Sequence, residues 1–145
     1  MKAKIRHAAL ADIPQMLELW RHFWPPQSYE QNLSVKINTD PDLVLVAGKD
    51  GRLVGTVIGG YDLWWAWVYR LAVHPDYQRC GIAKQLLSEI HKRLLARGAD
   101  SACLFASPQN EPMAYLLESL GYKRRDDVRY SLGIGKRPEK PVVCK

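Results

Sequence analysis

One polar stretch near the middle of the sequence carries residue types that could bind phosphate. It lies between the apolar run Leu71-Ala72-Val73 and a segment with helical periodicity. A helix N-terminus presents unpaired amide N–H groups and the positive end of its dipole, so it attracts phosphate. Gly81 has no Cβ to hold an anion away from the backbone, and Arg79 and Lys84 add positive charge. The alternative is a plain strand-to-helix turn in which Gly81 only relieves a tight bend. We predict a diphosphate-binding loop made of Gln78, Arg79, Cys80, Gly81, Ile82, Ala83 and Lys84.

The loop needs a strand before it and a helix after it, and the sequence indicates both. Residues 64–73 predict a long strand. The segment after the loop has an apolar face at helical spacing, made of Ile82, Leu86, Leu87, Ile90, Leu94 and Leu95. Gly98 is a natural residue to end this helix. Residues 101–106 predict the next strand, and this order implies a parallel, right-handed crossover.

The N-terminal part of the chain predicts a strand, two helices and two further strands. A short strand over residues 4–6 precedes a helix that Asp12 caps and that continues to Trp24. Ser28 with Gln31 resembles a capping box for a shorter second helix. Asp50-Gly51 is a strong hairpin signal, because both central residues of such a turn need a positive φ. It predicts an antiparallel pair made of residues 43–47 and 53–60.

The C-terminal part predicts one helix and a last strand. Asn110 is the expected cap of a helix that Gly121 ends. Residues 128–134 predict a strand that could pair with residues 122–124. The fold class is therefore α/β with a mixed sheet.

Composition and charge exclude several classes of protein. The 145 residues fit a single domain over residues 1–145, with a core over 3–134 and a tail over 135–145. No apolar run is long enough to span a membrane, and the N-terminus has no signal-peptide pattern. Cys80, Cys103 and Cys144 lack metal-site or disulfide spacing, so we expect free thiols, no bound metal and a cytoplasmic protein. The net charge of +6 is spread along the chain without a basic stripe, so nucleic acid is not an expected partner.

Two stretches together resemble a known family. Gln78-x-x-Gly81-x-Ala83 after Leu71-Ala72-Val73-His74-Pro75 resembles the acetyl-CoA loop of the GCN5-related N-acetyltransferases (GNAT). The segment from Asn110 to Leu120-Gly121-Tyr122 is similar to the second signature of that family. The order of elements matches over residues 3–134, and the chain most resembles small bacterial stand-alone members of the YpeA type. The resemblance implies a mostly antiparallel sheet of six or seven strands with about four helices, in the order β-α-α-β-β-β-α-β-α-β-β.

The resemblance also implies a reaction and a set of binding residues. The chain would be an acyltransferase that moves an acetyl group from acetyl-CoA to a primary amine by direct attack in a ternary complex. Backbone groups of the Leu71-Ala72-Val73 run would pair with the pantetheine arm, and amides from Arg79 to Lys84 would hold the pyrophosphate. Asn110 would contact the pantetheine, or act only as a helix cap. Dimers are common in the family, but the sequence leaves open whether this chain is a monomer or a homodimer.

The residues that would catalyse the reaction are less evident. Many family members have a tyrosine four residues before the closing glycine, where this chain has Leu117. This departure motivates an alternative, a CoA-binding regulatory or interaction module with little or no turnover. Candidates for the base that deprotonates the amine are Asp62, Tyr69, His74 and Tyr130. Asp62 also fits a turn residue, and His74 before Pro75 fits a strand-end loop.

An aromatic cluster is the candidate acceptor pocket. Alternate residues of a strand share a face, so Trp65, Trp67 and Tyr69 are expected on the same side as Leu71. Together with Tyr61 they could wall a pocket for the amine. Core packing or a dimer surface would explain the same residues equally well.

Overall fold

The computed structural model describes residues 2–27 and 30–135. These residues form two compact units, one of residues 2–26 with 30–104 and the other of residue 27 with 105–135. No helix in the described residues is both long enough and apolar enough to cross a membrane.

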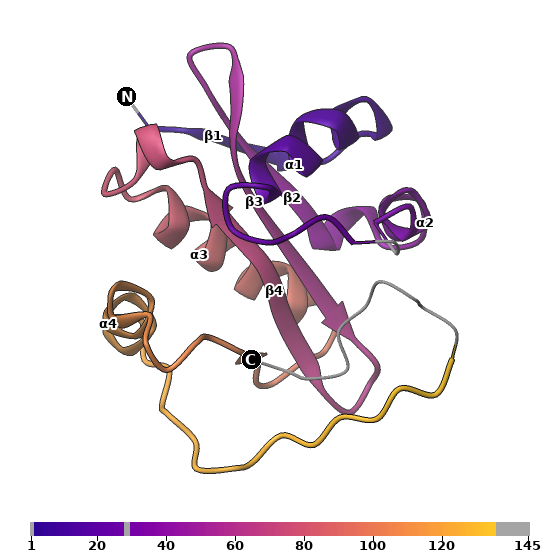
Figure 1. Ribbon diagram of the computed structural model, residues 1–145, viewed down its shortest axis with the longest axis vertical. Helices are drawn as coiled ribbons and strands as arrows, with labels where there is room; N and C mark the ends of the chain where they lie inside the picture. The colour runs from indigo at the N-terminus through magenta and orange to yellow at the C-terminus, as the bar shows by residue number, and fades with distance from the viewer. Residues whose placement is uncertain (1, 28–29, 136–145) are drawn as a thin grey trace. The chain divides into compact units, whose positions relative to one another are not determined.

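The first unit contains a five-stranded sheet, whose strands follow one another in chain order (Figure 1). Its first four strands pair antiparallel, and the fifth pairs parallel with the fourth. They are β1 (Lys4–His7), β2 (Val44–Lys49), β3 (Arg52–Tyr61), β4 (Ala66–Val73) and β5 (Cys103–Leu104). The predicted hairpin between β2 and β3 is confirmed, because Asp50 and Gly51 have φ values of 54° and 74°. The parallel β4–β5 crossover is also confirmed.

Helices cover both faces of this sheet. On one face lies α3 (Ile82–Ala96), whose buried side chains Ile82, Leu86, Leu87, Ile90 and Leu94 form its apolar side. Gly55 of β3 lets this helix approach, since a Cβ there would lie 3.0 Å from Leu86. On the other face α1 (Ile13–Trp20) and α2 (Asn32–Thr39) form a core with the sheet. That core contains Met16, Leu19, Trp20, Leu33, Ile37, Val44, Val46, Ile58 and Ala72.

The second unit contains α4 (Glu111–Ser119) and the segment after it. Four α-helices were expected and four occur in the described residues, but the expected six or seven strands are reduced to five. Residues 122–124 and 128–134 form no strand. The alternating apolar side chains of the second segment are 73–93% exposed, namely Val128, Tyr130, Leu132 and Ile134. A period of two specifies a strand only when another strand pairs with it and one face becomes buried.

Several predicted boundaries also differ from the structure. The first helix ends at Trp20. The chain continues to Trp24 in turns closed by i→i−3 hydrogen bonds, such as that from Phe23 N–H to Trp20 O. Asp12 precedes that helix, but its carboxylate accepts from the N–H of Ala9 and pairs with Arg6 instead of capping the first turn. The strand predicted over residues 101–106 is confined to β5. Ser28, part of the predicted capping box, lies outside the described residues.

Candidate functional site

The two halves of β4 have different neighbours. Its first half pairs on both edges, because Trp67 and Val68 face β3 on one side and β5 on the other. In the described residues β5 pairs no further along β4. The N–H of His74 donates to Val54 O of β3, so Leu71 and Val73 direct their N–H and C=O groups toward the opposite edge. The second half of β4 therefore has one edge without a strand partner in this part of the chain.

A β-bulge lies at the boundary between the halves. Thr56 pairs with Ala72 whereas Ile58 pairs with Tyr69, so Arg70 and Leu71 together oppose one residue of β3. Arg70 has a φ of 52°, which is uncommon for a residue other than glycine. The bulge changes which side chains share a face.

The prediction that Leu71 shares a face with Tyr69 is therefore wrong. Tyr69 lies over Gly60, on the face that α1 and α2 cover. Leu71 lies on the α3 face with Val73, which pairs with Gly55. Trp65 precedes β4 and is 54% exposed, so it is not one of the side chains that alternate between the two faces of the sheet.

Side chains of α1 and β3 hold the bulge in place. The indole Nε1–H of Trp20 donates to Thr56 Oγ1 at 2.9 Å, and the Thr56 hydroxyl donates to Arg70 O at 2.8 Å. The Arg70 guanidinium lies 4.9 Å from the ring centroid of Trp20 and 4.6 Å from that of Trp24. Sequence reasoning missed this network, although a buried threonine and an arginine inside apolar strands are its visible signals.

The loop after β4 leads directly into the N-terminus of α3. A 3₁₀ turn over Pro75–Tyr77 is followed by Gln78, whose side-chain amide donates to Val73 O at 3.1 Å. Arg79 and Gly81 then adopt left-handed conformations with φ of 62° and 80°. A Cβ at Gly81 would meet nothing within 4 Å, so the space in front of the helix is open.

The first amides of α3 have no side-chain cap. Gly81 occupies the N-cap position, and the first intrahelical bond runs from Gln85 N–H to Gly81 O. The N–H groups of residues 82–84 consequently have no partner within the helix. Arg79, Cys80 and Lys84 are exposed around them. This arrangement suits an anion, and the diphosphate-binding loop stays a prediction.

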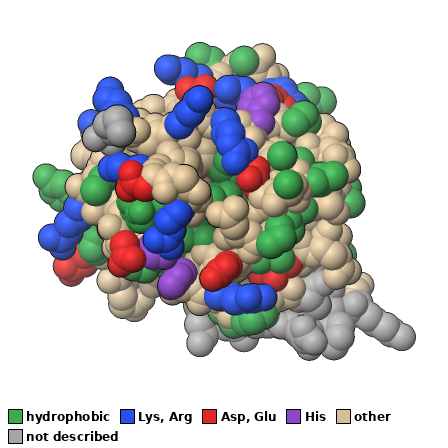
Figure 2. All heavy atoms as spheres, turned by 90° about the horizontal axis from the view of Figure 1, so that it is seen from above, with side chains coloured by type: hydrophobic (Ala, Val, Ile, Leu, Met, Phe, Trp, Pro, Cys, Tyr) green, Lys and Arg blue, Asp and Glu red, His purple; other side chains and the backbone are tan. Residues whose placement is uncertain are grey.

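Basic side chains elsewhere are interspersed with acidic ones. Figure 2 shows lysine and arginine side chains next to aspartate and glutamate on the visible face, without a continuous basic stripe. A shallow hollow of about 350 Å³ lies beside the first half of α3, lined by Ile5, Gly81, Lys84, Gln85, Ser88, Glu89 and Lys92. No group of three or more side chains that could hold a metal ion occurs in the described residues.

Asn110 and Leu117 belong to the second unit. The side chain of Asn110 accepts from Met113 N–H at 3.2 Å, so its expected role as the cap of α4 is confirmed. Leu117 is buried, and its carbonyl accepts from Tyr122 N–H after Gly121 has turned the chain with a φ of 96°. Tyr115 is 79% exposed, so α4 directs it differently from Leu117.

Comparisons with known proteins agree with this architecture. The acetyltransferase (GNAT) family model matches residues 13–122. An acetyltransferase of Sodalis glossinidius is 38% identical over 129 residues, which cover 87% of this chain and 89% of that protein. The chain belongs to the GNAT family.

Solved GNAT structures share the fold. The ribosomal-protein-S18-alanine N-acetyltransferase of Escherichia coli is 26% identical, with a TM-score of 0.70 over 82% of this chain and 76% of that one. The PaiA N-acetyltransferase of Thermoplasma acidophilum, solved with coenzyme A, is 21% identical, with a TM-score of 0.75 over 88% and 94%. The chain is therefore an N-acetyltransferase, and membership of the family implies acetyl-CoA as cosubstrate.

Two candidate bases of this GNAT protein have other partners. The Asp62 carboxylate accepts from the N–H groups of Trp64 and Trp65 at 2.9 and 2.7 Å, and these bonds lower its pKa. His74 Nδ1 accepts from Asp76 N–H at 3.1 Å, and its Nε2 lies 3.5 Å from a guanidinium nitrogen of Arg52. These contacts favour a turn role for Asp62 and a loop role for His74.

The two tyrosines differ from each other. Burial raises the pKa of Tyr69, and Asp40 raises it further, against a smaller opposing effect of Arg70. Its phenol is therefore protonated at neutral pH and could donate a hydrogen bond, but it is not a base. Tyr130 is 91% exposed and lies in the second unit.

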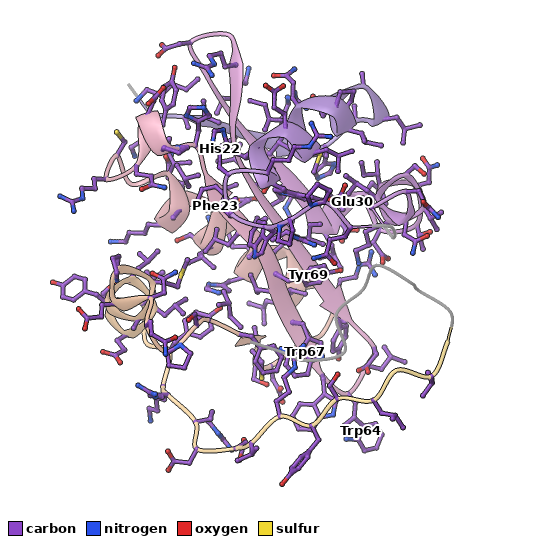
Figure 3. All side chains as sticks on the ribbon, viewed as in Figure 1. His22, Phe23, Glu30, Trp64, Trp67 and Tyr69 are labelled. Carbon is purple, nitrogen blue, oxygen red and sulfur yellow. The ribbon has the colours of Figure 1, made fainter. Side chains whose placement is uncertain are left out.

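The aromatic residues expected to bind the acceptor separate into two groups. Trp67 and Tyr69 lie one after the other along β4, as Figure 3 shows. The Tyr61 hydroxyl is instead at the end of β3, 3.5 Å from Leu63 O. Next to it Leu63 and Trp64 are 81% and 83% exposed, at the tip of the β3–β4 turn. The β4 pair is therefore the part of the predicted pocket next to the bulge.

Proposed function

We propose that this chain transfers the acetyl group of acetyl-CoA to a primary amine by direct attack in a ternary complex. The observation that carries the proposal is the open edge of β4 leading into an uncapped helix N-terminus. The edge offers backbone groups of Leu71 and Val73, and the helix offers the amides of residues 82–84. An elongated ligand with a diphosphate at one end and an amide-containing arm at the other fits both.

The loop would hold the pyrophosphate. Its amides and the helix dipole attract the negative charge, and Arg79 and Lys84 add to it. The open space at Gly81 allows the anion to contact the backbone directly. Gln78, Cys80, Ile82 and Ala83 would contribute through their backbone or by shaping the loop.

The pantetheine arm would lie along β4 as an additional strand. Val73 O already accepts from Gln78, so the groups left for the arm are the Val73 N–H and both backbone groups of Leu71. The Val73 N–H would polarise the thioester carbonyl. In this arrangement the enzyme contributes mainly by placing the two reactants.

The chemical step needs a neutral amine. Its nitrogen attacks the thioester carbon, the C–S bond breaks as the CoA thiolate leaves, and the nitrogen loses a proton to water to give the amide. The contacts of Asp62 and His74 suit a turn and a loop, so in this proposal the proton of the ammonium group passes to water before attack. The leaving thiolate takes a proton from water, because burial raises the pKa of the Tyr69 phenol and makes it a weaker acid. We expect the rate to rise with pH toward the pKa of the amine.

The acceptor amine is not specified by the site described above, and only the name of a relative points to a particular class of amine. The Escherichia coli relative acts on a ribosomal-protein alanine, so a protein or peptide N-terminus is one candidate. A lysine side chain, an amino acid, a polyamine and an antibiotic amine are others. A module that binds CoA with little turnover is the second candidate function, because Leu117 leaves no hydroxyl at its position.

Two measurements test the proposal. Titration calorimetry with acetyl-CoA should show one site per chain, and the absence of heat at high micromolar ligand would overturn both candidate functions. A panel of amines and peptides, followed by release of the free CoA thiol, separates enzyme from module. Tight acetyl-CoA binding without acceptor-dependent thiol release across the panel would favour the module.

A further inference from the structure

Arg70 is held in place more firmly than the other cations of the site, and no acidic residue of the described chain pairs with it. We propose that its guanidinium binds a carboxylate of the acceptor, so that the acceptor is an amine that also carries a carboxylate. The inference rests on the proposed function and specifies its substrate class.

The backbone of Arg70 is in a conformation that its residue type disfavours. A φ of 52° suits glycine or asparagine, and other L-residues adopt it only where the surroundings impose it. Here the surroundings are the Thr56 hydroxyl on the Arg70 carbonyl and the Trp20 indole on that hydroxyl. Glycine adopts this φ readily, so the backbone of the bulge does not explain why an arginine stands here.

The side chain is held by aromatic rings and not by an acid. Its guanidinium lies 4.9 and 4.6 Å from the ring centroids of Trp20 and Trp24. Trp20 therefore holds both the backbone of Arg70, through Thr56, and its side chain, through the indole ring. In the described residues no aspartate or glutamate forms an ion pair with Arg70. Other arginines of the same unit do have such partners, for example Arg93 with Glu89 and Arg97 with Asp42.

A guanidinium fixed in this way is suited to a planar anion. Contacts with aromatic rings leave its N–H groups available, and two parallel N–H groups match the two oxygens of a carboxylate. The rings reduce the conformational freedom that the side chain would otherwise lose on binding. A lysine ammonium group does not present two parallel N–H groups in a plane.

The position of Arg70 connects this anion site to the reaction. Arg70 directly precedes Leu71, whose backbone lines the open edge proposed for the thioester. Its side chain is on the α1 face of the sheet, next to Tyr69, which is 44% exposed. An acceptor anchored there by its carboxylate would bring its amine close to the bulge. The fixed positive charge would also disfavour the ammonium form of that amine, which reduces the need for a base.

The first test compares matched amines with and without the carboxylate. The pairs are L-lysine with cadaverine, L-tyrosine with tyramine, and β-alanine with ethylamine. For the best pair we expect kcat/KM to favour the carboxylated member by roughly 10–100-fold, the range of a charge-assisted hydrogen-bonded contact. Arg70→Gly removes the side chain but suits the left-handed backbone, and it should bring that ratio close to one. Arg70→Lys keeps the positive charge but loses the two parallel N–H groups, so it should give an intermediate ratio.

Arg21→Gln is the matched control, because it removes an exposed positive charge at the end of α1 without touching the bulge. It should keep the wild-type ratio. Equal kcat/KM for both members of every pair would overturn the inference while the proposed function stands. So would a ratio that survives in Arg70→Gly, or a stronger preference for O-phosphoethanolamine than for β-alanine.

A second measurement tests the inference even if none of these amines is acetylated. The Arg70 Nε–H resonance can be assigned by comparing the ¹H–¹⁵N spectra of the wild type and Arg70→Lys. We expect it to shift on titration with the carboxylated members and to stay unchanged with the decarboxylated ones. A resonance that does not respond to any carboxylate would overturn the inference. Failure of the proposed function would instead appear as absence of acetyl-CoA binding.

Discussion

The β2–β3 hairpin and the β4–α3 junction are built from the same backbone conformations and reach opposite results. Each turn combines a non-glycine residue of positive φ with a glycine, Asp50 with Gly51 in the hairpin and Arg79 with Gly81 in the junction. Each adjoins a ladder with a register shift. The hairpin returns its chain into the sheet, whereas the junction leaves a strand edge and a helix start open. A potential binding site arises from what a turn leaves unpaired and not from the turn conformation itself.

The largest expected effect comes from the two glycines of this comparison. Gly81→Glu places negative charge in front of the uncapped amides of α3, so acetyl-CoA affinity should fall by at least about 100-fold. Gly51→Glu is the matched control. Both glycines have positive φ and open space for a Cβ, so the conformational strain, about 1–2 kcal/mol, should be similar.

Calorimetry with acetyl-CoA and thermal unfolding would separate binding from stability. Similar unfolding midpoints, with affinity lost only in Gly81→Glu, are the expected outcome. Equal affinity in the two variants would refute the placement of the pyrophosphate at this loop.

The next effect concerns the register shift of the junction. Thr56→Val keeps the shape of the side chain but leaves the Trp20 N–H and the Arg70 carbonyl without their partner. The bulge should lose its fixed geometry, and kcat should fall by roughly 10–100-fold because donor and acceptor are less well placed. Thr56→Ser retains the hydroxyl and should recover most of the rate.

Val54→Ala serves as the control for a purely structural loss. Val54 is fully buried in the same strand, and its truncation should destabilise the fold by roughly 1–3 kcal/mol without touching the bulge. If Val54→Ala and Thr56→Val destabilise the fold equally and lower kcat equally, the geometry of the bulge has no role of its own in catalysis.

A smaller effect is expected from Gln78. Its side-chain amide donates to Val73 O at 3.1 Å and so connects the loop to the open edge. Gln78→Ala should raise the KM for acetyl-CoA about three- to tenfold, the effect of one partly exposed hydrogen bond, with little change in kcat. Gln85→Ala removes a longer contact, 3.5 Å to Ala3 O, from the side of α3 next to β1, and its KM should remain that of the wild type.

The smallest effect is expected at the opposite end of α3. Arg97 donates to Asp42 at 2.6 and 2.9 Å and to Asp40 at 3.1 Å. The hydrogen bond from Arg97 lowers the pKa of Asp42, and the bond from Lys36 lowers that of Asp40. This stability is present above the unfolded pKa of about 3.9 and is lost as the pH falls through the lower folded values.

Asp42→Asn should therefore lower the free energy of unfolding at pH 7 by less than about 1 kcal/mol, since the pair is partly exposed. The difference between the variant and the wild type should shrink at low pH. Acetyl-CoA affinity should be the same in both, and a change in affinity would show that the two ends of α3 are coupled.

Features that depend on short stretches of sequence could be predicted. The Asp50-Gly51 hairpin and the helix that ends before Gly98 follow from local turn chemistry and periodicity, and so does the Gly81 loop. The β4 bulge could not be predicted, because a register shift is fixed by both strands together and by side chains from a third element. Trp20 illustrates this, since nothing near it in the sequence indicates that it would contact Thr56 and Arg70. The prediction of a strand over residues 128–134 was wrong for a related reason. The alternation of apolar side chains can be read from the segment itself, but whether another strand pairs with it cannot.

The sheet keeps its strands in the order of the chain, and this has a consequence for folding. Each strand pairs with its predecessor, and short turns join β2 to β3 and β3 to β4, so these three strands can assemble early. Residues 8–43, with α1 and α2, separate β1 from β2. β5 joins only after the whole of α3 has crossed the sheet, and it is held to β4 by two residue pairs. The edge proposed for the donor therefore borders the part of the sheet that assembles last and opens most readily.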